Sequence, residues 1–487
     1  LGDVYKRQAY TYLVTYERFE QVMREYRQRL VDKTLQQALR RSGAVLVEGP
    51  KWCGKTTTAE QAAASIRYLD EPGKLESNQL LAKINPAELL AGSAPLLLDE
   101  WQLAPELWDA IRFTVDRRAT PGQFILTGSA VPANLEKLHH TGTGRFARIR
   151  MRPMSLYESG ESSGAVSLAK LFQNSAREDV EAPPNAETAP SVRNSTSGSK
   201  VLPDLLRSKS SANSREPRFL ASSALTIEDL CQAIIRGGWP QATFLSPADA
   251  TATARDYFQA VVTQDISRVD EVNRDEARTR RLMRSYARLQ GSQAAIATIQ
   301  ADMRAHEEQT MSPDTINNYL EALRRIFVIE DLPAWSPKLR SKTAIRTSDT
   351  RYFTDPSIAA TALEATGKDL AGDPQTLGFL FETLAVRDLR AYTEALGGAL
   401  YHYRDKSGLE CDTIAHLDDG RYSLIEIKLG GEDAIETAAA TLKKLAGLID
   451  TSKMRAPSFL AVLTGVGEFA YQRADGVYVI PLGTLGC

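Results

Sequence analysis

A short segment near the start of the chain has the residue types needed to bind a nucleoside triphosphate. Gly49 to Thr56 matches G-x-x-x-x-G-K-[ST], with an apolar run before it and a helical pattern after it. In this pattern backbone N–H groups surround a phosphate, the Lys reaches the β- and γ-phosphates and the hydroxyl can bind Mg²⁺. The alternative is a Gly-Lys turn that holds no ligand. The residues predicted to contact nucleotide here are Gly49, Pro50, Lys51, Trp52, Cys53, Gly54, Lys55, Thr56 and Thr57.

Two acids follow a second apolar run, about fifty residues after the loop. The run PLLLDEW delivers Asp99 and then Glu100 at the end of a predicted strand. Asp99 would hold Mg²⁺ together with Thr56, and Glu100 would polarise an attacking water, acting with Lys55 in catalysis. An ordinary strand that ends in solvent is the alternative interpretation.

A third apolar run ends in Thr127-Gly128-Ser129 and leads toward Arg145. Either Thr127 or Ser129 could sense the γ-phosphate, or the hydroxyls could only satisfy a turn. Arg145 follows a Gly-Thr-Gly sequence, so we consider it as an arginine finger that acts in cis or in trans. The segment from Arg145 to Arg152 alternates Arg with apolar residues, which is equally typical of an edge strand with a solvated basic face.

The last part of the chain carries a second set of acids. Asp412 and Glu426 stand on two predicted strands joined by a polar turn, and Lys428 lies two residues after Glu426 on the same strand face. Glu382 stands on a preceding helix. This order resembles the PD-(D/E)xK nuclease-like fold. The resemblance implies that Glu382, Asp412 and Glu426 bind metal and that Lys428 is catalytic. A generic α/β domain with surface acids, or a related fold without cleavage activity, remains an alternative.

A basic helical segment precedes this region. Arg281, Arg284 and Arg288 fall on one helix face and could contact the phosphates of duplex DNA. A second helix with Ser312 as its N-cap follows, and then a strand-like run and a basic loop over 338–346. That order is typical of a winged helix-turn-helix. A packing module with a solvated charged face is the other interpretation.

Alternation of strands and helices predicts an α/β protein with a parallel sheet. Further strands are predicted at 399–403, 412–416, 422–428, 458–464 and 477–481, after a helix over 377–392. Residues 1–8 look non-native, and the polar segment 160–218 has almost no aromatics and predicts a disordered linker. The predicted units are an extension (1–30), a P-loop core (31–159), the linker (160–218), a helical lid (219–275), a winged-helix-like module (276–350) and a nuclease-like domain (351–487).

Composition excludes several classes of protein. The chain has 487 residues, a net charge of −2 and 25% charged residues, which excludes a wholly disordered or histone-like protein. Its four cysteines are widely separated and indicate a reducing compartment. We expect a cytoplasmic protein without a membrane segment or signal peptide.

The segments LVEGPKWCGKTTTA, LLLDEWQ, FILTGSA and GRFARIRMRPMSLYE resemble the AAA-type ATPases of bacteria and archaea that end in a domain of unknown function. The later RGGWPQA and YFTDPSIAA are also similar to that family. The resemblance implies that ATP and Mg²⁺ are the cofactors and that the core could assemble as a homo-oligomer. We therefore expect ATP hydrolysis coupled to nucleic-acid binding or cleavage. The alternative is a nucleotide-switched regulatory protein whose nuclease-like domain is inactive.

Overall fold

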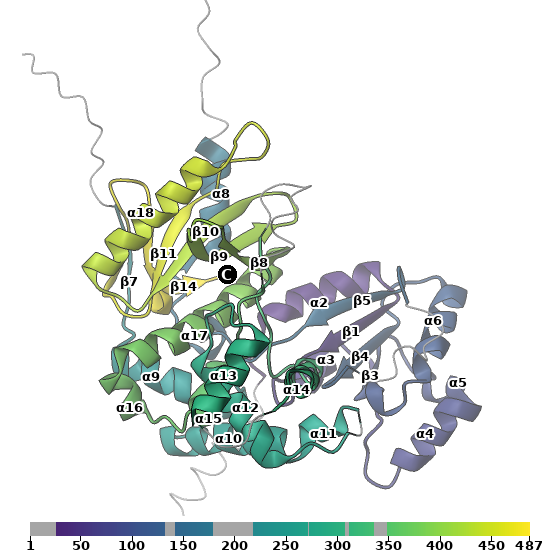
Figure 1. Ribbon diagram of the computed structural model, residues 1–487. Coiled ribbons are helices and arrows are strands. Elements are labelled where there is room, and N and C mark those ends of the chain that lie inside the picture. The colour runs from purple at the N-terminus through teal and green to yellow at the C-terminus, as the bar shows by residue number, and fades with distance from the viewer. Residues whose placement is uncertain (1–25, 132–141, 179–217, 271, 307–310, 336–347) are drawn as a thin grey trace, which may run out of the picture.

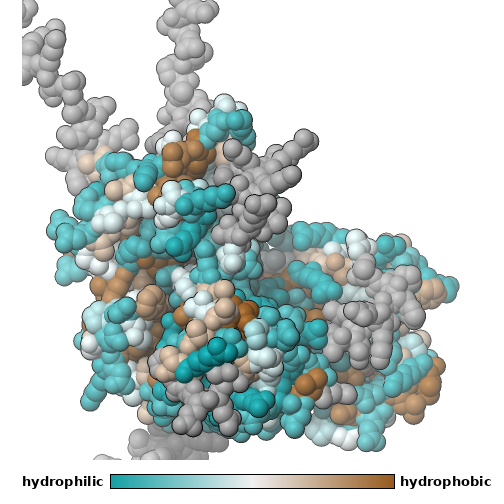
Figure 2. All heavy atoms as spheres, viewed as in Figure 1, coloured by the Kyte–Doolittle hydropathy of each residue, from teal (hydrophilic) through white to brown (hydrophobic). Residues whose placement is uncertain are grey.

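The computed structural model describes residues 26–131, 142–178, 218–270, 272–306, 311–335 and 348–487. Figure 1 shows a lobe with a parallel sheet on the right, a helical body in the lower centre and a second sheet at the upper left. Hydrophilic residues cover most of the face seen in Figure 2, and a hydrophobic patch lies over α4 (Leu75–Ile84), where Leu80 and Ile84 are exposed.

The right-hand lobe is built on five parallel strands in the order β2-β3-β4-β1-β5. Successive residues of the central strands point to opposite faces, and both faces are buried. Leu46 and Leu98 contribute to one core cluster, whereas Val45 and Leu97 contribute to another. The predicted parallel α/β core is confirmed. Its strands are β1 (Ala44–Glu48), β2 (Ser65–Tyr68), β3 (Leu96–Asp99), β4 (Phe124–Gly128) and β5 (Phe146–Arg150). Its helices are α2 (Leu30–Arg41), α3 (Lys55–Glu60), α4, α5 (Pro86–Leu89) and α6 (Leu107–Arg118).

The helical body contains the predicted three-helix order, in α12 (Glu276–Arg288), α13 (Ile296–His306) and α14 (Pro313–Arg325). Ser312 caps α14 as expected, and its side chain accepts a hydrogen bond from the Thr315 N–H at 3.2 Å. After α14 the backbone forms single bridges rather than a regular wing, and the basic loop 338–346 lies outside the described residues. The winged-helix interpretation therefore stays a prediction. The other helices here are α9 (Ile227–Arg236), α10 (Pro247–Ala260), α11 (Ile266–Arg268), α15 (Pro356–Ala362) and α16 (Gly367–Gly372).

The C-terminal lobe is a seven-stranded sheet in the order β7-β12-β13-β11-β10-β9-β8. Its predicted strands and preceding helix are confirmed, and β9 and β10 form the expected antiparallel hairpin. The strand β12 and the helix α18 (Glu432–Leu448), which packs on the sheet, were not predicted. The elements are α17 (Pro374–Ala395), β8 (Gly398–Arg404), β9 (Glu410–Leu417), β10 (Tyr422–Lys428), β11 (Leu460–Thr464), β12 (Phe469–Gln472) and β13 (Tyr478–Pro481).

The prediction that 160–218 is a disordered linker is wrong for its first part. A short strand β6 (Val166–Ser167) pairs with β14 (Leu485–Gly486), and α8 (Leu168–Glu178) follows it. Leu168 and Phe172 are buried in the main hydrophobic cluster, since the helix has an apolar stripe that the polar surroundings hide. Residues 179–217 lie outside the described residues, and β7 (Arg218–Ser222) then forms one edge of the C-terminal sheet.

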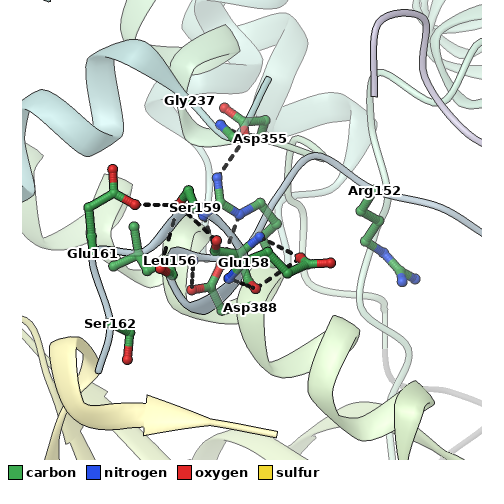
Figure 3. Close-up of polar contacts among 12 residues, drawn as sticks. Arg152, Leu156, Glu158, Ser159, Glu161, Ser162, Gly237, Asp355 and Asp388 are labelled. Carbon is green, nitrogen blue, oxygen red and sulfur yellow. Dashed lines mark hydrogen bonds and ion pairs between the residues drawn. The ribbon is translucent and has the colours of Figure 1, made fainter. Parts of the chain in front are cut away.

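A buried polar network joins the three lobes. On α17, Arg387 pairs with Asp355 and with Asp388, each at 2.8 Å. Asp355 accepts a hydrogen bond from the Gly238 N–H at 2.9 Å, and Asp388 accepts one from the N–H of Leu156, the first residue of α7 (Leu156–Ser159) (Figure 3). Since buried charges are costly unless paired, this network ties the segment after β5 and the segment after α9 to α17.

No helix among the described residues is long and apolar enough to cross a membrane.

Candidate nucleotide site and carboxylate cluster

The segment Gly49–Thr56 forms a tight loop between β1 and α3. A Cβ atom on Gly49 would lie 2.0 Å from the Met151 carbonyl oxygen, so no larger residue fits there. Gly54 adopts φ +95°, the left-handed region that glycine enters without strain. The Lys55 side chain is buried, and its ammonium group donates a hydrogen bond to the Pro50 carbonyl oxygen at 2.8 Å. The lysine is therefore held inside the loop to which it belongs.

Two hydroxyl groups meet at the carboxylate that ends β3. Thr56 Oγ1 donates to Asp99 Oδ1 at 2.8 Å, and Thr127 Oγ1, from β4, donates to the same oxygen at 2.5 Å. Burial raises the pKa of Asp99, and these two donors oppose that shift by stabilising the charged form. A hydroxyl and a carboxylate beside a phosphate-binding loop are the oxygen ligands that Mg²⁺ prefers, so Thr56 and Asp99 fit this ion.

Glu100 is held beside this pair by the end of β4. Its Oε2 accepts a hydrogen bond from Ser129 Oγ at 2.9 Å, and the Gln102 amide donates to the same oxygen. Its backbone N–H donates to Thr127 Oγ1 at 3.1 Å. Each of the two hydroxyl groups predicted to sense the γ-phosphate therefore donates a hydrogen bond to one of the two acids. Thr127 donates to Asp99, and Ser129 donates to Glu100.

A cavity of about 600 Å³ opens beside the loop, a volume typical of small-molecule sites. One wall is the loop itself, from Lys51 to Thr58, with Glu100 at its edge. We call this space the loop cavity. The remaining wall residues are Tyr26, Arg27, Arg29, Met154, Trp239, Pro240, Gln241, Phe244 and Thr253.

Sequence reasoning missed that opposite wall. Arg29 is buried and donates to the Cys53 carbonyl oxygen at 2.8 Å, and Lys51 pairs with Asp265 at 2.6 Å. Trp239 belongs to the segment RGGWPQA. That segment is similar to the AAA-type family, but the similarity did not predict what Trp239 does. Arg27 and Arg29 had no signal, since arginines in a polar segment are normally exposed. The predicted residues Gly49, Pro50 and Cys53 shape the loop from behind the cavity, with Cys53 fully buried.

Arg145 lies at the opposite end of the sheet from the loop. The backbone carbonyl oxygen of Arg145 accepts a hydrogen bond from the N–H of Ala44, the first residue of β1. The phosphate-binding loop follows Glu48, the last residue of β1, and therefore lies at the other end of that strand. The guanidinium of Arg145 pairs with Asp116 at 2.8 Å. The prediction of a finger acting on the nucleotide of its own chain is therefore wrong, because parallel strands present their two ends to opposite edges. β5 is an edge strand, as the alternative interpretation had it, and a finger acting in trans stays a prediction.

Three side chains of the C-terminal lobe form a compact group that we call the carboxylate cluster: Asp412, Glu426 and Lys428. Lys428 Nζ lies 2.9 Å from Asp412 Oδ2 and 2.7 Å from Glu426 Oε2. Glu426 Oε1 is buried and has no hydrogen-bond partner among the described residues. Burial and the Asp412 carboxylate raise the pKa of Glu426, whereas Lys428 opposes that shift. An unpartnered carboxylate oxygen beside a second carboxylate is a fitting pair of ligands for a divalent cation.

Glu382 approaches the cluster without completing it. Its carboxylate accepts a hydrogen bond from the Tyr352 hydroxyl at 2.5 Å, and burial together with the Asp412 charge raises its pKa. Within the described ranges, no three His, Cys, Asp or Glu side chains are grouped closely enough to hold a metal ion. Glu410, the other acid on β9, is exposed and pairs with Arg404. The structure therefore brings together Asp412, Glu426 and Lys428, but not a set of three carboxylates.

The predicted basic face of α12 is divided. Arg288 makes a close ion pair with Asp302 of α13 at 2.6 Å, whereas Arg284 lies 3.6 Å from the exposed Glu364. Arg281 is half-buried nearby. Arg288 is thus engaged within the protein, whereas Arg284 has only a loose partner, and a phosphate-binding face made of all three arginines stays a prediction.

Residues 41–160 match the family model of an AAA domain. This match supports ATP binding and hydrolysis by the P-loop lobe. Residues 227–369 match a domain of unknown function (DUF8612), and residues 377–485 match another domain of unknown function (DUF4143). The matched ranges follow the lobes: the parallel sheet, the helical body, and α17 with the second sheet. The nuclease resemblance of the last lobe rests on its residues alone.

The chain is also similar to two sequence relatives and to a solved structure. Two uncharacterized proteins, one from Mycobacterium bovis and one from Mycobacterium tuberculosis, are each 29% identical over 132 residues. Those residues are 26% of this chain and 29% of the length of each relative. A solved structure of a Walker-type ATPase of Pyrococcus abyssi is 13% identical, with a TM-score of 0.36, covering 68% of this chain and 94% of that one.

Proposed function

We propose that this chain is a Mg²⁺-dependent ATPase whose nucleotide site acts together with a nucleic-acid site in the helical and C-terminal lobes. The observation that carries the ATPase is the meeting of Thr56, Asp99 and Thr127 at one carboxylate oxygen, next to a loop of the phosphate-binding pattern. Three separate elements, α3, β3 and β4, meet at this oxygen. A simple turn between a strand and a helix would not need such an arrangement.

Each residue has a stated task in hydrolysis. Thr56 and Asp99 would hold Mg²⁺, which would supply positive charge at the phosphates when bound. Lys55 exchanges the Pro50 carbonyl oxygen for a phosphate oxygen, since an ammonium group binds a charged oxygen more strongly than a neutral carbonyl oxygen. Glu100, oriented by Ser129, polarises the attacking water.

Calorimetric titration of the protein with ATP and Mg²⁺ tests nucleotide binding. Lys55→Ala should weaken binding at least tenfold, since a charge-assisted contact is worth about 1.5–3 kcal/mol. Lys74→Ala is the matched control, because Lys74 is exposed, pairs with the neighbouring Glu71 and lies outside the loop cavity. Equal affinities of the wild type and Lys55→Ala would contradict the assignment of the loop.

The nucleic-acid part of the proposal rests on the carboxylate cluster. A lysine ammonium within 2.9 Å of each of two carboxylates supplies the groups that metal-assisted phosphodiester hydrolysis needs. Incubation of supercoiled plasmid with Mg²⁺, with and without ATP, tests cleavage. Nicking that Asp412→Ala removes supports the proposal, and intact plasmid under all conditions contradicts cleavage.

A specific observation favours the second candidate function, a nucleotide-switched binding protein. Lys428 already forms an ion pair with each of the two carboxylates, and Glu382 accepts a hydrogen bond from Tyr352. A cluster whose carboxylates are already paired with a lysine does not have to cleave a nucleic acid that the protein binds. DNA retained in a filter-binding assay, without nicking, would favour this function over a nuclease.

A further inference from the structure

A second cavity, of about 410 Å³, lies between α10, α12 and α15 and is rich in arginine. We call it the arginine cleft. Its floor includes Phe258 and Ala360, which are almost fully buried, so the floor is apolar. The charged residues of its wall are Arg255, Arg280, Arg281, Arg284 and Glu364. Four cations against one acid make the cleft strongly electropositive.

The arginines of the cleft differ in how firmly they are paired. Arg284 and Glu364 are separated by 3.6 Å, and the exposed fractions of their side chains are 45% and 78%, so their pairing contributes little. Arg255 is exposed and makes no ion pair within the described part of the chain. Arg280 pairs with Glu276 on its own helix at 2.9 Å. An incoming anion could therefore engage Arg255 and Arg284 by displacing only one weak partner.

We infer that the arginine cleft binds the phosphodiester backbone of a single-stranded nucleic acid. This inference rests on the proposed nucleic-acid function and specifies where the strand is held. Guanidinium groups bind phosphate through two parallel hydrogen bonds, and several of them converge here from two helices. The cavity is large enough for a nucleotide-sized group but too small for a duplex. An apolar floor beside cations is typical of surfaces that accept an unpaired base.

The position of the cleft relates it to both other sites. α10 separates it from the loop cavity, since Thr251 and Arg255 face the cleft while Thr253 lines the loop cavity. In the same helix, Tyr257 stacks on Trp239 with ring centres 4.1 Å apart. In the other direction, α12 leads to Gly291, where an added Cβ would lie 3.0 Å from the Glu382 carboxylate. The cleft therefore lies across α10 from the loop cavity, and the helix that carries most of its arginines, α12, ends near Glu382.

Fluorescence anisotropy with a labelled single-stranded oligodeoxynucleotide of about 20 nucleotides tests the inference on the full-length protein. The triple variant Arg255→Ala, Arg281→Ala, Arg284→Ala should bind at least tenfold more weakly. Its log–log salt dependence should be flatter by about two units, since each phosphate contact on a single strand contributes about 0.7. Glu364→Gln should bind more tightly than the wild type, because the competing carboxylate is removed.

Arg288→Ala is the matched control, since Arg288 lies on the same helix but pairs with Asp302 outside the cleft. Its salt dependence should equal that of the wild type. Because Arg255 is exposed, Arg255→Glu alone gives a second variant that does not depend on folding of the triple variant, and it should also weaken binding.

The outcomes separate this inference from the proposed function. If the wild type binds the oligonucleotide and the cleft variants bind equally well, the cleft assignment is wrong while the nucleic-acid function stands. If the wild type neither binds nor cleaves DNA, the nucleic-acid function fails and the inference fails with it. Tighter binding of poly-glutamate than of the oligonucleotide would also overturn the inference and would indicate an acidic protein partner.

Discussion

One carboxylate is central to each of the two candidate sites: Asp99 in the nucleotide site and Asp412 in the carboxylate cluster. Each is positioned by two hydrogen-bond donors. Asp99 is held by Thr56 and Thr127, and Asp412 accepts the Ile427 N–H at 2.7 Å as well as the Lys428 ammonium. Since these contacts differ, substitutions at the two sites should have separable effects.

Asp412→Ala and Glu426→Ala should each abolish Mg²⁺-dependent cleavage while leaving ATP hydrolysis unchanged, because the two acids lie in a different lobe from the loop cavity. Lys428→Ala should reduce cleavage while retaining much of the metal affinity. Plasmid nicking and phosphate release, measured on the same preparations, check both statements. Glu410→Ala is the control, since Glu410 is exposed and pairs with Arg404. Loss of cleavage in that control would contradict the assignment of Asp412.

The pH dependence of stability should carry a contribution from His402. Burial lowers its pKa to about 4, so the folded protein keeps it neutral while the unfolded chain takes up a proton below about pH 6.5. The stabilisation is therefore present above pH 6.5 and is lost as the pH falls toward 4, by at most about 3 kcal/mol. Urea unfolding at pH 7 and pH 5 measures it, and His402→Gln should show a smaller difference than the wild type.

Motif spacing located the residues of the P-loop, Asp99 and Glu100, because each set follows the carboxyl end of an apolar strand, and parallel strands bring those ends to the same edge of the sheet. It could not locate Arg29 or Trp239, since their role depends on tertiary contacts across the loop cavity. Spacing also suggested one face for Arg281, Arg284 and Arg288, but it could not show that Asp302 would engage the last of them. For Arg145, only the strand register reveals that it stands at the wrong edge of the sheet.

Helices and strands were predictable where the sequence carries a clear local pattern, such as a continuous apolar run or a helix N-cap. The central strands β1, β3 and β4 are continuous apolar runs since both of their faces are buried, and α14 carried a complete N-terminal signal at Ser312 and Pro313. The short elements β6 and α8 were missed, because a composition averaged over 160–218 hides the few apolar residues at its start.

Deletion of α8 should therefore destabilise the protein, and a single substitution tests this more sharply. Phe172 is 1% exposed and packs edge-to-face on Phe459 with ring centres 5.1 Å apart. Phe172→Ala should lower the free energy of unfolding by about 3–5 kcal/mol, measured by urea denaturation. Phe219→Ala is the control, since 61% of Phe219 is exposed and its loss should cost far less. Equal effects of the two substitutions would show that α8 contributes no core.

The whole molecule is held together by buried charge as well as by apolar packing. Arg387 sits between Asp355 and Asp388, and through them it contacts the backbone of Gly238 and Leu156. Gly238 directly precedes Trp239 of the loop cavity, and Arg387 shares α17 with Glu382. The helix that approaches the carboxylate cluster is thus linked to the wall of the nucleotide site.

Arg387→Met should destabilise the protein by about 3–5 kcal/mol, since it leaves two buried carboxylates unpaired. The triple variant with Asp355→Asn and Asp388→Asn should recover part of that loss, because the unpaired charges are removed. Unfolding free energies of the three proteins form the comparison. A triple variant less stable than Arg387→Met would contradict the view that uncompensated charge is the cause.

The most direct test of the ATPase assignment is steady-state phosphate release from ATP and Mg²⁺ by the wild type and by Glu100→Gln. The wild type should hydrolyse ATP. Glu100→Gln should bind ATP with similar affinity and hydrolyse it at least about a hundredfold more slowly, since an amide cannot polarise water as a carboxylate does. A wild type without activity, or equal rates for the two proteins, would contradict the account.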